Sequence, residues 1–279
     1  LLSKVRLRSK RILNFFVFFC LKKLSMLVGI SEAICLLITK KKMLMNQSFN
    51  EWLAGVIDGD GCFQLSKKGY ACLEITMDIR DKHCLYQIKQ KFGGSVKIKS
   101  DINYLRYRLH HKKGLLELIN SINGFIRNPT RLIQLKQICD KYGLNLLYAE
   151  ALTYNNGWLA GMIDADGSIY LNLQSDQVFI SIGQKNKLLL DPLVPLYGGS
   201  IYMQKQTEAF KWVVYRKKEI LALLEYFRHA PLRSAKKNRV FLISKYFLLK
   251  DLKAHLAAPN SILGKEWKLF LKNWESYSG

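Results

Sequence analysis

Apolar and polar residues alternate along several short stretches of the chain, a pattern typical of strands that bury one face of a sheet. The predicted strands are 62–68, 70–79, 95–99 and 104–110, then 168–174, 178–184, 200–205 and 210–216. Helical spacing of apolar residues occurs at 81–92, 112–121, 131–142, 218–228 and 234–250. A stretch at 188–196 contains Pro192 and Pro195, which predict a short or irregular helix. The mixture of both patterns predicts an α+β fold.

A ten-residue motif occurs twice in the chain. Residues 52–61 read WLAGVIDGDG and residues 158–167 read WLAGMIDADG, so eight of the ten positions are identical. The sequence Gly-Gly-Ser follows at 93–95 and again at 198–200. Two copies at a domain-sized spacing indicate a duplicated domain. We therefore predict a first repeat over 47–150 and a second over 151–279, with an extension over 1–46 before them.

Each motif is predicted to form an apolar helix that contains small residues. The small pairs are Ala54–Gly55 and Ala160–Gly161. If these faces meet, the two helix backbones can approach closely, although small residues are also common in core helices. We expect Gly61 and Gly167 to end the helices in left-handed caps, since glycine lacks a Cβ.

The last acid of each motif is the candidate for chemistry. If the two helices pair, the carboxylates of Asp60 and Asp166 lie near the pseudo-twofold axis, at helix C-termini whose partial negative charge favours a cation. Together with the carbonyl groups of Gly59 and Ala165 they are hard oxygen ligands, which suit Mg²⁺. The sequence therefore predicts a metal site at the paired helix ends.

The earlier acids of the motifs, Asp58 and Asp164, are interpreted as structural. We expect them to cap or hydrogen-bond the adjoining strands. A calcium loop of the EF-hand type is disfavoured, because its twelfth position would be Gly69 or Ser175 rather than Glu.

The predicted strands carry polar side chains of intermediate length on one face. Gln and Asn can bond adenine, and Lys and Arg can reach guanine or phosphate. For any single residue, simple exposure to solvent on a strand is the simpler explanation. Two matched polar faces, however, favour a protein that contacts bases in a DNA groove. The candidates for DNA binding are Gln64, Ser66, Lys68, Glu74, Thr76, Ser95, Lys97, Lys99, Arg106 and Arg108, then Tyr170, Asn172, Gln174, Ser181, Ser200, Tyr202, Gln204 and Lys211.

Composition sharpens the choice of partner. The 279 residues include 44 Lys+Arg and 21 Asp+Glu, a formal net charge of +23, while 49% of the residues are hydrophobic. Disorder is excluded as the main state, and an anionic partner is indicated, either nucleic acid or an acidic membrane surface. The six cysteines show no CxxC spacing, so neither a zinc site nor a disulfide framework is predicted, and a reducing compartment is the simplest interpretation.

The extension over 1–46 is basic and holds two apolar runs, 12–21 and 24–38. The runs have ten and fifteen residues, and a membrane-spanning helix needs about twenty. We expect a poorly ordered or processed extension, with an interfacial helix and a signal or anchor as the alternatives.

The paired motifs resemble those of the LAGLIDADG homing endonucleases and their maturase relatives, in the single-chain, two-repeat type of organellar introns. The resemblance covers about residues 47–250. It implies two pseudo-symmetric αββαββα repeats, motif helices paired at the centre, and antiparallel sheets that form a DNA-binding saddle. It also implies that Asp60 and Asp166 are catalytic acids that bind metal.

The same resemblance implies a Gln and a basic residue beside the acid in each half. Gln184 and Lys236 match these positions in the second half. In the first half the Gln position falls on Met77 or Asp78. The basic position, counted from the proline before each helix, falls on Gln134, so that Arg131 or Lys136 must substitute, and Lys136 is the residue we predict.

The function that the resemblance implies is site-specific, Mg²⁺-dependent cleavage of both strands of DNA at a long asymmetric site. Mn²⁺ or Ca²⁺ would occupy the same site. One alternative is an RNA-binding maturase that assists group I intron splicing, with or without DNA cleavage, and a weaker one is a non-catalytic DNA-binding regulator. The implied partners are double-stranded DNA and intron RNA. The implied state is a monomer, in an organelle, specifically the mitochondrion.

Overall fold

The computed structural model describes residues 46–98 and 103–276. The chain divides into two compact units, 1–47 and 48–279. The first unit lies almost wholly outside the described residues, and so do the expectations for the basic extension. Among the described helices, none is long and apolar enough to cross a membrane.

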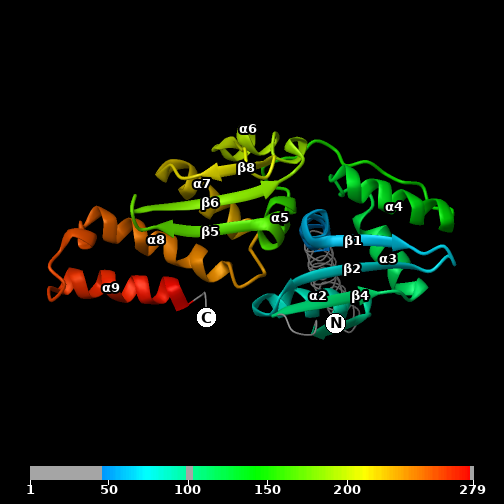
Figure 1. Cartoon of the computed structure of the whole chain (residues 1–279), viewed down its shortest axis with the longest axis horizontal. Helices are drawn as coiled ribbons and strands as arrows, with labels where there is room; N and C mark the ends of the chain where they lie inside the picture. The colour runs from blue at the N-terminus through cyan, green and yellow to red at the C-terminus, as the bar shows by residue number, and fades with distance from the viewer. Residues whose placement is uncertain (1–45, 99–102, 277–279) are drawn as a thin grey trace, which may run out of the picture. The chain divides into compact units, whose positions relative to one another are not determined.

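The first repeat begins with a helix over residues 46–60 and continues through two pairs of strands (Figure 1). Its elements are β1 (Gly61–Leu65), β2 (Ala71–Asp78), the 3-10 helix η1 (Ile79–Asp81), α2 (Lys82–Phe92), β3 (Ser95–Ile98), β4 (Tyr104–Leu109), α3 (Lys112–Ile122) and α4 (Pro129–Tyr142). These follow the predicted order and differ from the predicted bounds by a few residues at their ends.

The second repeat has the same order and ends with additional helices. Its elements are α5 (Trp158–Asp166), β5 (Gly167–Asn172), β6 (Gln177–Gln184), η2 (Lys187–Leu189), α6 (Leu193–Tyr197), β7 (Ser200–Gln204), β8 (Ala209–Val214), α7 (Lys217–His229), α8 (Lys237–Asp251), η3 (Ala254–Leu256) and α9 (Ile262–Glu275). The predicted irregular helix at 188–196 is observed as η2 and the five-residue α6. Helix α9 was not predicted.

Each repeat contains one four-stranded antiparallel sheet. The strand orders are β1-β2-β4-β3 and β5-β6-β8-β7, so the two sheets have the same topology. Their registers also match: Gly61 pairs with Ile75 where Gly167 pairs with Ile182. The α+β fold of two αββαββα repeats is therefore confirmed, and equivalent positions of the two sheets can be compared residue by residue.

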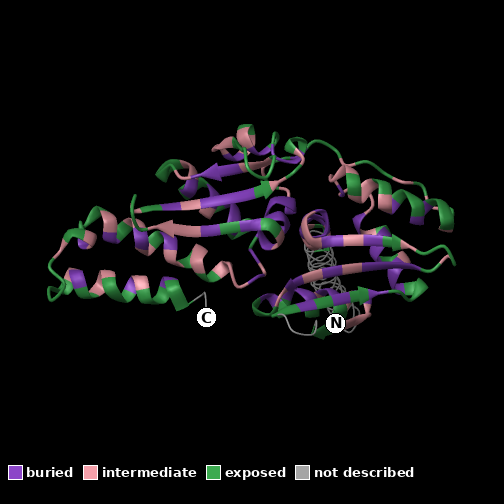
Figure 2. Cartoon of the chain, in the orientation of Figure 1, coloured by how far each residue is buried: buried purple, intermediate pink, exposed green. Residues whose placement is uncertain are grey.

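The hydrophobic core lies against one face of each sheet, as the alternating sequence predicts (Figure 2). In β4, Leu105, Tyr107 and Leu109 are buried and the residues between them are exposed. The motif helices are buried over residues 51–58 and 158–164, and they lie between the two sheets (Figure 1).

The two motif helices meet through their glycines. A Cβ added to Gly55 would overlap the carbonyl oxygen of Trp158, and one added to Gly161 would overlap that of Trp52. The reciprocal contact confirms the predicted seam. It also shows why both positions exclude a side chain, since here backbone packs directly on backbone.

Each motif tryptophan hydrogen-bonds to an acid of the opposite helix. Trp52 Nε1 donates to Asp164 Oδ2 at 2.8 Å, and Trp158 Nε1 donates to Asp58 Oδ2 at 2.7 Å. Asp58 also accepts from the backbone N–H of Arg127 at 2.8 Å. Its structural role is thus observed, but its partners are the opposite helix and the segment before α4, not the adjoining strands. A buried indole N–H needs an acceptor, and this requirement decides the pairing.

The glycines that end the motif helices are not left-handed caps. Gly167 has φ −76° and ψ 154°, and Gly61 is absent from the glycines with positive φ. The expectation was wrong because the strand starts immediately after the helix and folds back over its last turn. A Cβ on Gly61 would lie 2.7 Å from Ile57 Cα, and one on Gly167 would lie 2.5 Å from Ile163 Cα. Glycine is required here for space, not for its dihedral angles.

Candidate functional site at the paired helix ends

The motif helices bring the second acids of both motifs together. A Cβ placed on Gly59 would lie 2.5 Å from Ala165 Cβ and 2.9 Å from Asp166 Oδ2. The carboxylate of Asp166 therefore lies against the last turn of the opposite helix, the turn that carries Asp60. Asp60 is half-buried and Asp166 is exposed, so the site opens to solvent.

The electrostatics of this site disfavour two negative charges without a cation. Burial raises the pKa of Asp60 to about 7, the nearby Asp166 carboxylate contributes to the rise, and Lys236 opposes it. Partial desolvation by the surrounding protein atoms also raises the pKa of the Asp166 carboxyl, and a hydrogen bond from Gln184 opposes this rise. Two carboxyl groups in close proximity resist ionising together, and a bound cation relieves that repulsion.

A basic side chain from another element contacts the last turn of each motif helix. Lys236 Nζ donates to the carbonyl oxygens of Ile163, Asp164 and Ala165 at 2.9, 2.9 and 3.0 Å. In the first half, Arg131 Nη2 donates to the carbonyl oxygen of Gly59 at 3.3 Å. These cations complement the negative C-terminal ends of the helix dipoles.

The prediction of Lys136 as the basic residue of the first half was wrong. Lys136 is exposed on α4 and pairs with Asp140 at 2.7 Å, one helical turn away. Arg131, the alternative, reaches the site, while Gln134 accepts a hydrogen bond from the backbone N–H of Phe63 at 3.2 Å.

The proline count, which fell on Gln134 and led to Lys136 as its substitute, used the wrong reference. Asn128 and Ser234, not the prolines, are equivalent residues, because their backbone N–H groups bind Asp58 and Asp164 at 3.1 and 3.2 Å. Counted from these two residues, Lys236 corresponds to a position next to Arg131.

Gln184 contacts the acid of its own half. Its Nε2 donates to Asp166 Oδ2 at 2.5 Å from the end of β6. By register its counterpart in β2 is Met77, which is buried in the core. The other candidate, Asp78, forms an ion pair with Arg80 at 2.9 Å. The two halves therefore differ beside the acid.

Sequence reasoning missed a third acid near the site. Asp81 is buried, and its Oδ1 accepts from the backbone N–H of Ala235 at 2.7 Å, directly before Lys236. The first repeat thus holds the segment of the second repeat that carries the basic residue. The equivalent of Ala235 is Pro129, which has no N–H to donate. The signal that the sequence offered was an acid at the first position of the helix predicted over 81–92.

The donor set fits a hard divalent ion that keeps several water ligands. Among the described residues, no group of three or more His, Cys, Asp or Glu side chains could enclose a metal. The protein therefore offers two carboxylates and the carbonyl groups of Gly59 and Ala165, each of which already accepts one hydrogen bond from a basic side chain. Mg²⁺ is commonly held by one or two carboxylates, with water or substrate phosphate completing the shell.

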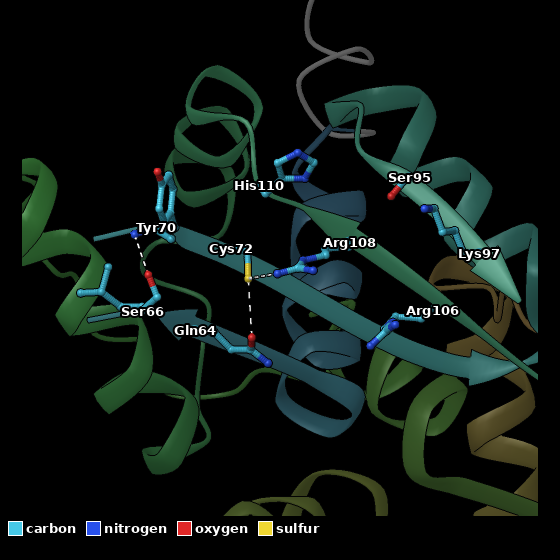
Figure 3. Close-up of a pocket in the computed structure, with 11 residues that line it drawn as sticks. Gln64, Ser66, Tyr70, Cys72, Ser95, Lys97, Arg106, Arg108 and His110 are labelled. Carbon is cyan, nitrogen blue, oxygen red and sulfur yellow. Dashed lines mark hydrogen bonds between the residues drawn. The ribbon is translucent and has the colours of Figure 1, made fainter. Parts of the chain in front are cut away.

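The polar face of the first sheet forms a hollow of about 720 Å³ (Figure 3). Glu74 lies between two arginines, 3.8 Å from Arg106 and 3.2 Å from Arg108, so its carboxylate is already paired. Thr76 is half-buried beside Arg106 in the register. The sequence did not identify Tyr70, Cys72 or His110 as part of this face. The lining residues include the predicted Gln64, Ser66, Ser95, Lys97, Arg106 and Arg108.

The corresponding face of the second sheet is largely aromatic. Tyr170 stacks on Phe179 with ring centroids 5.1 Å apart, and Phe179 lies 5.8 Å from Tyr215. Lys211 Nζ lies 5.3 Å from the Tyr170 ring centroid. Tyr202 and Gln204 are exposed on β7, and Ser200 at its start is half-buried. Phe179 and Tyr215 were not predicted, because only polar residues of the alternating strands were considered as DNA contacts.

Several predicted contact residues do not lie on the strand faces. Lys68 and Gln174 belong to the turns between strands, and the Asn172 side chain accepts the backbone N–H of Gln174 at 2.9 Å. The Asn172 side chain is therefore engaged in an Asx turn. Ser181 is buried, with no partner for its hydroxyl among the described residues. Lys99 lies outside the described residues.

A family model described as LAGLIDADG endonuclease matches the chain twice, over residues 53–142 and 159–247. The intron-encoded DNA endonuclease ai2a of Dictyostelium discoideum is 35% identical over 241 residues, which cover 84% of this chain and 77% of that protein. The intron-encoded RNA maturase bI4 of Saccharomyces cerevisiae is 40% identical over 237 residues. This alignment covers 83% of this chain, and the chain spans only 37% of the yeast protein.

The fold has solved counterparts. The I-LtrWI LAGLIDADG homing endonuclease bound to target DNA matches with a TM-score of 0.62, covering 83% of this chain and 98% of that one. At 19% sequence identity the likeness concerns the fold alone.

Proposed function

Since the chain belongs to the LAGLIDADG endonuclease family, we propose that it is a site-specific DNA endonuclease that hydrolyses both strands of a long, asymmetric target. The observation that carries this proposal is the convergence of Asp60 and Asp166 at the ends of two packed helices, each with a basic residue on the same turn. DNA-bound relatives of the same fold support duplex DNA as the substrate.

The residues of the site divide the work of phosphodiester hydrolysis. Asp60 and Asp166 would hold Mg²⁺, for which Mn²⁺ or Ca²⁺ can substitute, with Gly59 and Ala165 offering carbonyl oxygens. The bound ion supplies charge stabilisation at the phosphate and lowers the pKa of water. Gln184 fixes the orientation of the Asp166 carboxylate through its hydrogen bond. Lys236 and Arg131 place positive charge where the phosphate gains negative charge.

Separate measurements of binding and cleavage test the proposal. Duplexes recovered from a randomised library by binding would be offered to the wild type and to Asp60→Asn, Asp166→Asn and the double variant. We expect the double variant to bind within a few-fold of the wild type and to cut at least about 100-fold more slowly, because the metal ligands are lost. Undiminished cutting by the double variant would remove these acids from the mechanism.

A second candidate function is assistance to splicing of a group I intron, which the maturase from Saccharomyces cerevisiae favours through its 40% identity. Because splicing assistance needs an RNA-binding surface and not hydrolysis, the double Asp→Asn variant should retain it. A splicing assay with the intron RNA from the chain's own locus would separate the two roles.

The intron-encoded relatives also favour an organellar origin, and we place the protein in the mitochondrion. Both repeats lie in one chain and supply one acid each, so we propose that a monomer suffices for activity. The boundaries 1–46, 47–150 and 151–279 remain our proposal for the domain organisation.

A further inference from the structure

The two sheets have the same register but opposite surface chemistry. Gln64 pairs with Cys72 in β1 and β2, where Tyr170 pairs with Phe179 in β5 and β6. The equivalence continues across each sheet, with the first-sheet residue named first. The further pairs are Glu74 and Ser181, Arg108 and Val213, Arg106 and Lys211, Lys97 and Tyr202, and His110 and Tyr215.

On the first sheet these positions present hydrogen-bond donors. The side chains of Arg106 and Arg108 are 47% and 53% exposed, and Lys97 is exposed beside them. Glu74 binds Arg108 through Nε at 3.2 Å, and Arg108 Nη2 makes a weak contact with Cys72 Sγ at 4.0 Å, so the guanidinium is held on this face of the sheet. Donors of this kind match the O6 and N7 acceptors of guanine in the major groove.

On the second sheet the same positions present apolar surface. Phe179 has Tyr170 stacked on it at an interplanar angle of 9° and has Tyr215 as a second ring neighbour. Val213 stands where the first sheet has Arg108 but is only 8% exposed, so the rings make up most of this surface, and Lys211 lies over the Tyr170 ring. Each ring of this pair has one face covered by the other ring, and Lys211 and Tyr215 lie near them. An unpaired RNA base would need a free ring face, whereas the 5-methyl group of thymine needs only apolar surface.

We propose that the two halves of the target differ in base composition. The first sheet reads a G·C-rich half-site through Arg106 and Arg108, and the second reads an A·T-rich half-site through thymine methyl groups against the stacked rings of Phe179 and Tyr170. This inference rests on the proposed function, because it takes duplex DNA on both sheets as given.

Binding selection from a randomised duplex library, with the wild-type protein in EDTA to prevent cleavage, tests the composition. Enrichment of one G·C-rich and one A·T-rich half-site is the expected result. If no duplex is enriched, the proposed function fails together with this inference. Enriched duplexes with half-sites of similar composition overturn this inference alone.

Base analogues then identify the bases that each sheet reads. Replacing guanine by 7-deazaguanine in the first half-site should weaken binding about tenfold for each N7 acceptor removed from an arginine. Replacing thymine by uracil in the second should weaken it about threefold for each methyl group removed. Each analogue placed in the opposite half-site should have little effect. Equal sensitivity of both half-sites would contradict the proposal.

Variants link each effect to its sheet. Arg108→Ala should make binding insensitive to 7-deazaguanine, and Phe179→Ala should make it insensitive to uracil, while Lys136→Ala on the surface of α4 retains both responses. If Arg108→Ala changes only the salt dependence, this arginine contacts phosphate and the proposal fails. It also fails if Phe179→Ala weakens binding of single-stranded RNA and not of the duplex.

Discussion

At the residue scale, the basic groups on the last turns of the motif helices carry much of the functional argument. Lys236 holds three carbonyl oxygens of α5, and Arg131 holds one of the first motif helix. Both are near enough to Asp60 to lower its pKa, against the effects of burial and of Asp166. The proposed binding of metal and phosphate between these carboxylates would depend on this charge balance.

Arg131→Ala should reduce the rate of DNA cleavage by about 100-fold, because removal of one charge-stabilising donor typically costs that much. Lys136→Ala is the matched control, since Lys136 lies on the same helix and pairs with Asp140 at the surface. Single-turnover cleavage rates at saturating protein compare the two. Equal effects of both variants would mean that Arg131 acts only through the fold.

The raised pKa of Asp60 predicts a pH dependence of the metal-free protein. The carboxyl group titrates near pH 7 when folded and near its ordinary pKa of 3.8 when unfolded, so the free energy of unfolding falls as pH rises between these values. Asp60→Asn should therefore raise stability at pH 8 relative to pH 4, by about 1–2 kcal/mol in this solvent-open site. Urea unfolding of both proteins at the two pH values measures this. A difference that does not depend on pH would contradict the assignment.

How far the sequence predicts the site depends on the residue. Asp60 and Asp166 follow from the repeated motif, whereas Gln184 follows from the family resemblance together with its place at the end of an alternating strand. The contact of Arg131 with Gly59 could not be predicted in this way, because it depends on how the first turn of α4 packs against the motif helix. The contact of Asp81 could not be predicted either, because its partner lies 154 positions away. Contacts between the repeats are set by packing, which a linear pattern does not contain.

At the scale of elements, the pairing of the motif helices determines the site. Gly55 and Gly161 let backbone meet backbone, and the crossed hydrogen bonds from Trp52 and Trp158 fix the register of the two helices. The sequence predicted the small-residue seam, but the role of the tryptophans required the structure. The crossed bonds give the first acid of each motif, Asp58 and Asp164, a structural role in the helix pair.

Gly55→Ala should lower the free energy of unfolding by about 2 kcal/mol or more, because the added Cβ overlaps the Trp158 carbonyl and outweighs the better helix propensity of alanine. Gly183→Ala is the control, because among the described residues, its two chain neighbours aside, no atom lies within 4 Å of a Cβ at that position. Thermal unfolding compares both variants with the wild type. A neutral Gly55→Ala would contradict the close helix packing.

Helix α9 extends the second repeat beyond the family match, which ends at residue 247. Its Phe270 and Trp274 are buried, with the Phe270 ring 6.1 Å from that of Tyr246 on α8. The sequence contains a signal for this helix, because Ser261 is a typical N-cap residue directly before it. In the structure the Ser261 hydroxyl accepts a hydrogen bond from the backbone N–H of Gly264 at 3.1 Å. Apolar residues then follow at helical spacing, at 263, 267, 270 and 274.

Phe270→Ala should lower the free energy of unfolding by about 3 kcal/mol, the usual cost of removing a buried aromatic ring. Leu269→Ala, at a neighbouring position that is 46% exposed, should change it by less than about 1 kcal/mol. Urea denaturation of the full chain measures both. Similar losses for the two variants would show that α9 is not packed as described.

At the scale of the whole molecule, the formal charge of +23 and the duplicated architecture both fit the proposed binding of an asymmetric DNA duplex. Two sheets of equal topology flank the helix pair, and each half supplies one acid to the centre. The halves are equivalent in fold but not in chemistry, since Gln184 has the buried Met77 as its counterpart and the sheet faces differ in polarity. Such a molecule suits an asymmetric polyanion, and a long non-palindromic duplex is the simplest example.

The most direct test of the central claim is a cleavage selection from a randomised duplex library, sequenced after incubation with the full chain. With Mg²⁺, the wild type should cut both strands of one family of related sequences, and it should cut none in EDTA. The Asp60→Asn, Asp166→Asn double variant should leave the library intact while still retaining those sequences on binding. Cleavage by the double variant, or wild-type cleavage that persists in EDTA, would contradict a metal-dependent centre built on these two acids.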